Sequence, residues 1–535
     1  MFSDFAIVCF LWRSKCSIII FKKQYDSYRV ILTSLKKNIV YKPISDNLYR
    51  LANSLSVHEA GYCTGYINRL KITQGKNYIF IINTLRKQEA YDEDALKKAC
   101  NDRDISTRFS YHKGLLYDYV LNGLIACRAQ ASTEHEVFRC IAAATILSRK
   151  NLFALALKEL DKASQQAAFY EKHYLLLQVL ETQRKLMKQT SIPGLEQKLE
   201  ANRNQKKEVI AKIENEDHFA SINDRVYLLY REMHVLKNDH KLSELEEVMQ
   251  CPSLKNKASA LTFDSKLRYH YIHSHYNQLK GNYSAALEHR EAALQLWNNA
   301  PHMVSENPMS YRHDLSNLLS MRNVTGNYKD FEQLLSRIEK MENTSPDHDA
   351  ATFREVYYLR MLYLLNTGKK EEALQLIPAI EKGLIRYAAF INPSRLLNFY
   401  YNNIITCFLC KHYKEALRWT DKLIETGKNK NVRIDLTDFA SILEIILYFE
   451  TGKHDLVQYR LRNTQARLKK NNKLHAFEKL VLNYINRIIL CKEKEPKTTK
   501  TWQAFQHELQ QLTTLHGTDK LLGLEEVNIW VKEKA

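Results

Sequence analysis

Two groups of residues in this sequence have side chains and spacing that could bind a metal ion. Cys407 and Cys410 form a C-x2-C pair within the run CFLC, and three histidines cluster in HYIHSH, at His270, His273 and His275. A zinc site needs four ligands, usually presented by a tight loop. The cysteine pair lies in an apolar helical run without a second pair nearby, and only the first two histidines share a helix face. We therefore expect no metal site and interpret both cysteines as core residues.

Sequence motifs for catalysis or cofactor binding are absent. The chain has no Gly-rich phosphate loop, no His-Glu-x-x-His and no Gly-x-Ser-x-Gly nucleophile motif. Paired acidic residues such as Glu371 and Glu372, or Glu246 and Glu247, have the pattern of solvated helix faces. We therefore predict a protein that is not an enzyme, with no catalytic residues and no cofactor.

Basic residues near the N-terminus suggest a different chemistry, the binding of DNA. A short helix is predicted at 93–99 and a longer one at 108–127, which together could form a helix-turn-helix. The residues that would then face DNA are Arg103, Arg108, His112 and Lys113. However, the connection NDRDIST is longer than the usual turn, and its two aspartates would repel phosphate. Nucleic-acid binding is therefore kept as an alternative that we do not favour, and a helical cap over the neighbouring apolar surface is preferred.

The composition predicts an all-α protein. The 535 residues include only 14 Gly and 9 Pro, against roughly 37 and 27 at average usage. Turns that need positive φ, and segments that cannot be helical, must therefore be scarce. Hydrophobic residues make up 45% of the chain, enough for a large core, and the net charge of +19 is spread over the chain rather than confined to one tail. The ten cysteines have no regular spacing, which favours a reducing, cytoplasmic compartment.

A recurring pattern indicates that helices come in pairs. Gly281 is followed by Tyr283, Ala286 and Ala293, at offsets of two, five and twelve residues, and similar patterns follow anchor residues at 151, 326, 368, 411 and 452. From 281 to 452 the anchors recur every 41 to 45 residues. Each anchor is expected to end one helix in a left-handed conformation, with the aromatic residue plugging the gap and the small residue allowing close helix approach. The structural positions of the pattern include Gly326, Tyr328, Gly368, Ala373, Tyr413, Ala416 and Gly452.

These units resemble tetratricopeptide repeats, whose second half carries the same Gly-x-Tyr-x2-Ala…Ala pattern. The resemblance is best over 265–465 and extends back to about 135. The period exceeds the family's usual 34 residues, the closing Pro is absent, and Pro378 falls inside a predicted helix that it should kink or break. The whole chain also resembles a type of bacterial repeat protein that supplies no activity. The implied fold is a superhelical array of antiparallel helix pairs, a TPR-like α-solenoid, with a helical N-terminal domain and a concave groove.

The resemblance implies that the first helix of each pair lines this groove. Asn317 and Asn402 each lie nine residues before an anchor, so they are expected to be equivalent, and an Asn amide can donate to and accept from a peptide main chain. Arg268, Tyr271 and His275, on the first helix of the Gly281 unit, could add charge and ring stacking. The alternative is that both asparagines simply face solvent.

The predicted domains are an atypical segment at 1–43, a helical N-terminal domain at 44–130, the repeats at 131–490, and a basic linker with capping helices at 491–535. The first segment has apolar runs too short to cross a bilayer, and we interpret it as translated upstream sequence, against an anchor or a strand-like appendage. The apolar cluster around Trp530 is expected to close the end of the stack, with a dimer contact as the alternative.

We expect a non-enzymatic scaffold that binds a protein or peptide on the concave face of the repeats. The alternative is a DNA-binding transcriptional regulator whose repeat domain senses a ligand or forms a homodimer. No stable membrane insertion is expected.

Overall fold

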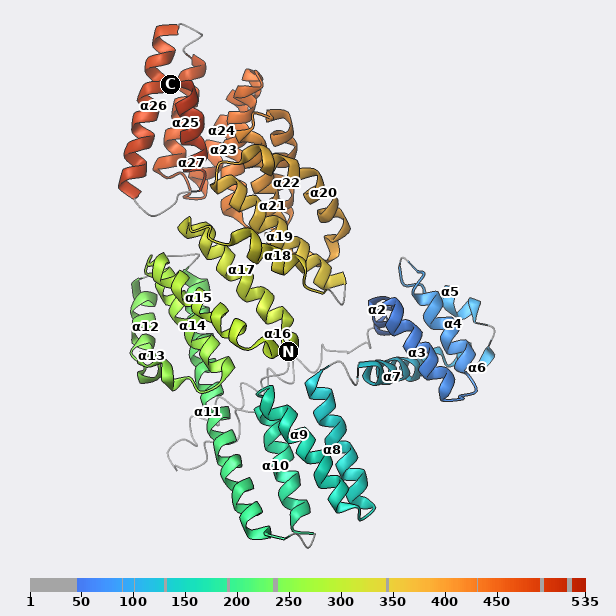
Figure 1. The fold of residues 1–535 in the computed structure, drawn as a ribbon. Coiled ribbons are helices and arrows are strands. Elements are labelled where there is room, and N and C mark those ends of the chain that lie inside the picture. Colours follow the sequence, from blue (N-terminus) through green and yellow to red (C-terminus); the bar gives the residue numbers. More distant parts are fainter. Residues whose placement is uncertain are drawn as a thin grey trace, which may run out of the picture. The chain divides into compact units, whose positions relative to one another are not determined.

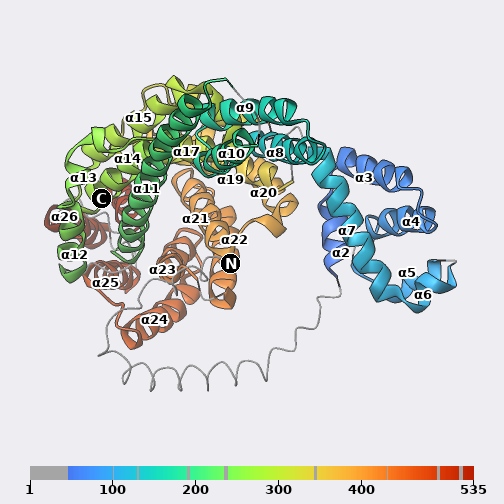
Figure 2. The ribbon, with the colours of Figure 1, turned by 90° about the horizontal axis from the view of Figure 1, so that it is seen from below.

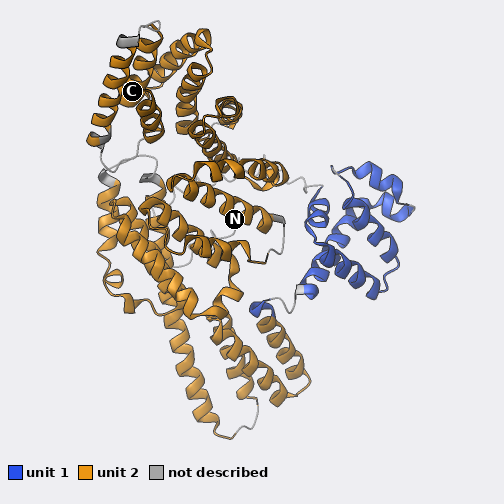
Figure 3. Ribbon diagram, turned by 45° about the horizontal axis from the view of Figure 1, so that its top comes forward, with its two compact units in different colours: residues 1–135 blue, residues 136–535 orange. Residues whose placement is uncertain are grey.

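The computed structural model describes residues 46–88, 90–100, 102–128, 132–189, 193–233, 239–342, 346–430, 432–490, 495–516 and 522–535. The described residues form an all-α structure, in which 85% of them are helical and none is in a strand (Figure 1). The chain divides into two compact units, residues 1–135 and 136–535 (Figure 3). The predicted segment 1–43 lies outside the described residues.

Unit 1 is a small helical domain that contains helices close to both predicted ranges, 93–99 and 108–127. Its helices are α2 (Asn47–Ser54), α3 (Val57–Arg69), α4 (Gly75–Leu85), α5 (Glu93–Ala99), α6 (Arg103–Thr107) and α7 (Phe109–Arg128). Ser56 separates α2 from α3 and forms a capping box with Glu59, in which each side chain accepts a hydrogen bond from the other's backbone N–H. The prediction missed α6, because Asp102 caps it within a stretch that reads as a polar linker.

In unit 2, helices that follow one another in the sequence pack against each other (Figures 1 and 2). Its first helices are α8 (Thr133–Arg149), α9 (Phe153–Phe169), α10 (His173–Met187), α11 (Leu195–Met233), α12 (Asp239–Met249) and α13 (Pro252–Lys255). The middle of the unit contains α14 (Phe263–Leu279), α15 (Tyr283–Asn299), α16 (Pro301–Glu306), α17 (Pro308–Thr325), α18 (Phe331–Glu339), α19 (Pro346–Asn366) and α20 (Lys370–Arg386). The last helices are α21 (Pro393–Leu409), α22 (Tyr413–Lys430), α23 (Ile434–Glu450), α24 (His454–Lys470), α25 (Ala476–Leu490), α26 (Glu495–His516) and α27 (Leu524–Lys534).

The anchor residues adopt the left-handed conformation that their spacing predicts. Gly281, Gly326, Gly368 and Gly452 have φ between 70° and 77°, and the same conformation occurs at 151 and 411. After each anchor the next backbone N–H donates to the carbonyl five residues back, as Lys369 does to Leu364 at 2.8 Å. This bond satisfies a carbonyl that the end of the helix would otherwise leave unpaired.

The two apolar positions of the pattern are confirmed as core positions. The residues five after each anchor, including Ala286, Ala373 and Ala416, are at most 1% exposed, and those twelve after are at most 5% exposed. Small side chains here let the second helix of a pair approach the first closely.

Three details differ from the expectation. Tyr283 is 37% exposed, so it does not plug the gap between its helices, whereas Tyr328 packs edge-on against Tyr363. The helix α20 continues through Pro378 without a break. Left-handed turns with the same hydrogen bond also follow α9 and α24, at residues 171 and 472, where neither turn carries a glycine.

Four apolar clusters succeed one another along unit 2, and each shares a helix with the next. The shared helices are α11, α14 and α19. The last cluster includes Trp530 of α27, which lies 5.2 Å from the ring of Trp502 and donates to Glu450 at 2.9 Å. Trp530 is thus part of the core of its own chain, as the capping interpretation requires.

Candidate functional site

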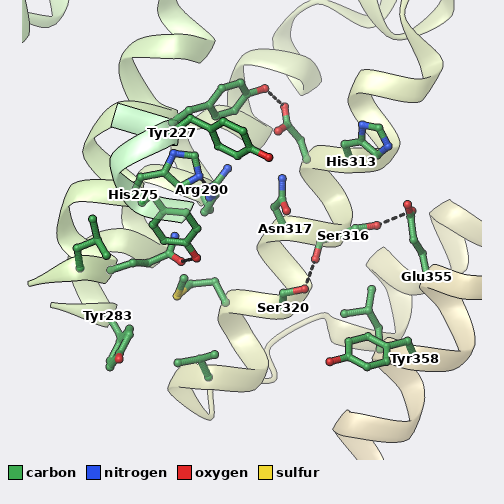
Figure 4. Close-up of a pocket in the computed structure, with 18 of the residues that line it drawn as sticks. Tyr227, His275, Tyr283, Arg290, His313, Ser316, Asn317, Ser320, Glu355 and Tyr358 are labelled. Atoms are coloured by element: carbon green, nitrogen blue, oxygen red, sulfur yellow. Dashed lines mark hydrogen bonds between the residues drawn. The ribbon is translucent and has the colours of Figure 1, made fainter. Parts of the chain in front are cut away.

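A cleft of about 1720 Å³ lies in the middle of unit 2, between α11, α14, α15, α17, α19 and the start of α21 (Figure 4). The repeat pattern determines part of the lining of this cleft. Tyr271, Ser316 and Tyr358 all line the cleft, and each lies ten residues before its own anchor glycine. Successive first helices therefore present the same face to one cavity. Tyr227 and Tyr230 of α11 add two further aromatic side chains.

Arg290 of α15 is the principal charged group within the cleft. It lines the cavity although it is only 6% exposed. Its Nη2 donates a hydrogen bond to the Nε2 of His275 at 3.0 Å. The carbon of its guanidinium lies over the ring of Tyr271, 5.5 Å from the ring centroid. No carboxylate of the described residues lies within salt-bridge distance of it, and its Nε has no hydrogen-bond partner. A buried cation without a paired anion is unusual, because desolvation strongly disfavours it.

His275 is held neutral beside this cation. Its Nε2 accepts the hydrogen bond from Arg290, which places the ring proton on Nδ1. Burial, and then the charge of Arg290, lower the pKa of His275 to about 3. The ring stacks near Tyr230 at 4.6 Å, and Nδ1 is buried without a partner. His275 therefore orients the guanidinium without adding positive charge.

Asp314 of α17 carries the nearest negative charge but is already hydrogen-bonded. Its Oδ2 accepts from the hydroxyl of Tyr271 at 2.5 Å and from the indole of Trp297 at 2.6 Å. Burial raises the pKa of Asp314 and, with the neighbouring carboxylate, raises that of Tyr271 well above its usual range. Asp314 acts on Arg290 through its field rather than through an ion pair.

The outer part of the cleft is polar and mostly exposed. Asn317 is exposed and lies across from Arg290 in Figure 4. Ser316 donates to Glu355 at 2.7 Å, and Glu355 also lies 3.6 Å from Arg354. The exposed Arg395 of α21 has no ion pair with a described residue.

Three of the five predicted groove residues line this cleft: Tyr271, His275 and Asn317. Arg268 does not, because its guanidinium is bound to Asp264 at 2.8 Å and to a backbone carbonyl of α11. Asn402 is 5% exposed and packed inside α21. The expected equivalence of the two asparagines is therefore wrong.

Sequence reasoning missed Arg290, although the sequence contained a readable sign of it. Arg290 lies four residues after Ala286 and three before Ala293, so it belongs to the buried face of α15. An arginine between two core alanines is an exception to the apolar pattern of that face.

The four residues considered for DNA binding are largely engaged within unit 1. Arg108 pairs with Asp104, and Lys113 pairs with Glu93 at 2.5 Å. His112 is 5% exposed and its Nδ1 is 2.7 Å from the hydroxyl of Tyr78.

His112 is thus a core residue and not a surface residue, which corrects its expected position. Arg103 is exposed. DNA binding by this unit stays a prediction, and it receives no support from these contacts.

The residues considered as metal ligands make contacts within the fold. His273 and His289 stack at 4.9 Å, and the Nδ1 atoms of His270 and His289 are 3.0 Å apart, so the α14 histidines meet a histidine of α15. Cys407 is fully buried, and burial raises the pKa of its thiol to about 12. Both observations fit packing roles.

A second group, Glu171, His173 and Glu216, brings three possible ligand atoms together. His173 Nδ1 lies 2.8 Å from Glu216, and Glu171 accepts from the backbone N–H of Phe263 at 2.7 Å. The first of these bonds connects α10 to α11, and the second connects the turn between α9 and α10 to α14.

Comparison with known proteins adds no further assignment: no protein-family model matches the chain, and no curated protein sequence matches it. Among the described helices, none combines the length and the apolar character needed to cross a membrane. The described residues thus form an all-α protein of consecutively packed helices, with the cleft in unit 2 as its candidate site.

Proposed function

We propose that unit 2 is a TPR-like α-solenoid and that its cleft binds a segment of another protein or a peptide. The observation that carries this proposal is the cleft itself, which combines tyrosines from α11, α14 and α19 with the buried Arg290 and the exposed amide of Asn317. Ligand sites commonly combine aromatic side chains with placed polar groups, and this cleft contains both. Tyr and Arg are also the residue types that most often dominate binding energy at protein interfaces.

The repeat gives this proposal a geometrical basis. Tyr271, Ser316 and Tyr358 occupy one register position on three successive first helices, so the cleft runs across the helices rather than along one of them. An extended chain crossing such a surface would meet one helix after another, with side-chain pockets between aromatic rings. The amide of Asn317 can both donate to and accept from a peptide group.

An affinity capture with a blocked cleft tests this function. The full chain would be used as bait in an extract of the cells that make it, in parallel with Asn317→Trp, which places a bulky side chain in the cleft, and with Glu288→Trp. Glu288 is an exposed residue of α15 outside the cleft and provides a matched control. We expect the wild-type and control chains to retain the same partner and Asn317→Trp to lose it. Equal recovery with all three chains would contradict binding in the cleft.

A further inference from the structure

The geometry points to an acidic segment as the occupant of the cleft, with one of its carboxylates bound to Arg290. This inference rests on the proposed function and specifies which ligand chemistry the cleft selects. The guanidinium of Arg290 is buried, and its only hydrogen-bond partner among the described residues is the neutral His275. An arginine cannot lose its proton to escape this environment. An incoming carboxylate would therefore supply the direct ion pair that Asp314, which acts on Arg290 only through its field, does not.

The accessible part of Arg290 faces the cavity. Its Nε is sealed from solvent, and one Nη2 contact is used by His275. Its Nη1 is not sealed and makes no hydrogen bond to a described residue. Hydrogen bonds from a guanidinium to a carboxylate are among the strongest in proteins, and removal from water strengthens them further. The hydrogen bond to His275, whose ring packs against Tyr230, and the contact with the ring of Tyr271 fix the position of this donor before a ligand arrives.

The charges along the cleft favour a singly charged group. Lys280 is bound to Glu246 at 2.5 Å, and Arg354 lies 3.6 Å from Glu355, so these cations already have partners. Arg290 and Arg395 are the cations of the lining that lack an ion pair with a described residue.

The buried Asp314, close enough to interact with Arg290, would repel a doubly charged phosphate more strongly than a carboxylate. A carboxylate at Arg290 with a second acidic residue towards Arg395 fits this distribution.

The carboxylate could come from an Asp or Glu side chain or from the C-terminus of the bound chain. Affinity selection from random peptides of about eight residues, which extend to about 26–29 Å, would separate the two sources. One pool would have free C-termini and the other amidated C-termini. Enrichment of Asp or Glu in both pools identifies a side-chain carboxylate. Retention of peptides from the free-acid pool alone identifies the C-terminal carboxylate. Either result supports the inference.

Matched variants connect the selection to Arg290. We expect Arg290→Gln to lower the enrichment of carboxylate peptides by about tenfold or more, with Arg290→Lys intermediate because it keeps the charge but not the planar fork. Arg395→Gln, on the exposed rim, should have a smaller effect. A wild-type selection that retains peptides without any preference for carboxylates would overturn the inference and leave the proposed function standing. Retention of no peptides would overturn both.

A direct measurement avoids reliance on the folding of the Arg290 variants. The best peptide from the selection would be titrated against the wild-type full chain, together with its Glu→Gln or amidated counterpart. We expect the counterpart to bind about tenfold more weakly or worse. Equal affinity of the two peptides would overturn the inference.

Discussion

Gly368 offers the sharpest test of the paired-helix pattern, because its substitution changes the conformational energy of the backbone without adding a steric clash. Its φ is 76°, and a Cβ added there would meet nothing within 4 Å, so Gly368→Ala creates no clash. Forcing an L-residue into the left-handed conformation costs about 1–2 kcal/mol. The reduced freedom of the unfolded chain returns about 0.4–1 kcal/mol of this. We therefore expect the turn between α19 and α20 to lose about 1 kcal/mol of stability.

Hydrogen exchange measured by mass spectrometry is the appropriate assay, since helical arrays open locally and need not unfold in one step. A loss of about 1 kcal/mol corresponds to roughly fivefold faster exchange, expected for amides at the end of α19 and the start of α20. Gly368→Asn should lie between wild type and alanine, because asparagine tolerates this conformation better.

Gly61→Ala is a control that should change stability in the opposite direction. Gly61 lies inside α3 with open space around it, where alanine should stabilise the helix by about 1 kcal/mol. Unchanged or slower exchange in Gly368→Ala would refute the assigned role of the anchor.

Two further predictions concern unit 2. Burial lowers the pKa of His270 and His289 to about 4 and that of His275 to about 3, from an ordinary value of 6.5. The unfolded chain takes up protons at these positions below about pH 6.5, and the folded chain does so only near pH 4, so acidification between these values should lower the urea midpoint. A midpoint that stays constant from pH 7 to pH 4.5 would contradict this expectation. Ala286→Leu inserts bulk at a position with no exposure and should cost about 1–3 kcal/mol in urea unfolding. The same change at the partly exposed Ala285 should cost less, and equal losses would argue against close helix approach at the first site.

The periodic features of the fold could be predicted from the sequence because they depend on local chemistry. Glycine at a left-handed turn, followed by buried residues five and twelve positions later, reflects backbone sterics and helix geometry that hold wherever the residues occur. The sequence pattern did not predict the turns at Glu171 and Asn472, because neither residue is a glycine. The carboxylate of Glu171 also binds the backbone of Phe263, which is distant in the sequence.

The candidate site was less accessible to sequence reasoning. Tyr271, His275 and Asn317 could be placed near one another from repeat register alone. The different fates of Asn317 and Asn402 could not, because the exposure of each depends on how neighbouring helices cover it. The long α11, which supplies Tyr227 and Tyr230, contributes to two apolar clusters, and its position follows from packing rather than from local propensity.

Site-specific photo-crosslinking tests the central claim, that a partner occupies the cleft of unit 2. A photoreactive residue would be introduced at Asn317 or at Glu288 of the full chain in the cells that make it. After illumination, we expect a discrete crosslinked partner from position 317 and none from position 288. The crosslink should be lost when an acidic peptide obtained by selection is added in excess to permeabilised cells. Crosslinking of the same proteins from both positions, or from neither, would show that the cleft is not the binding site.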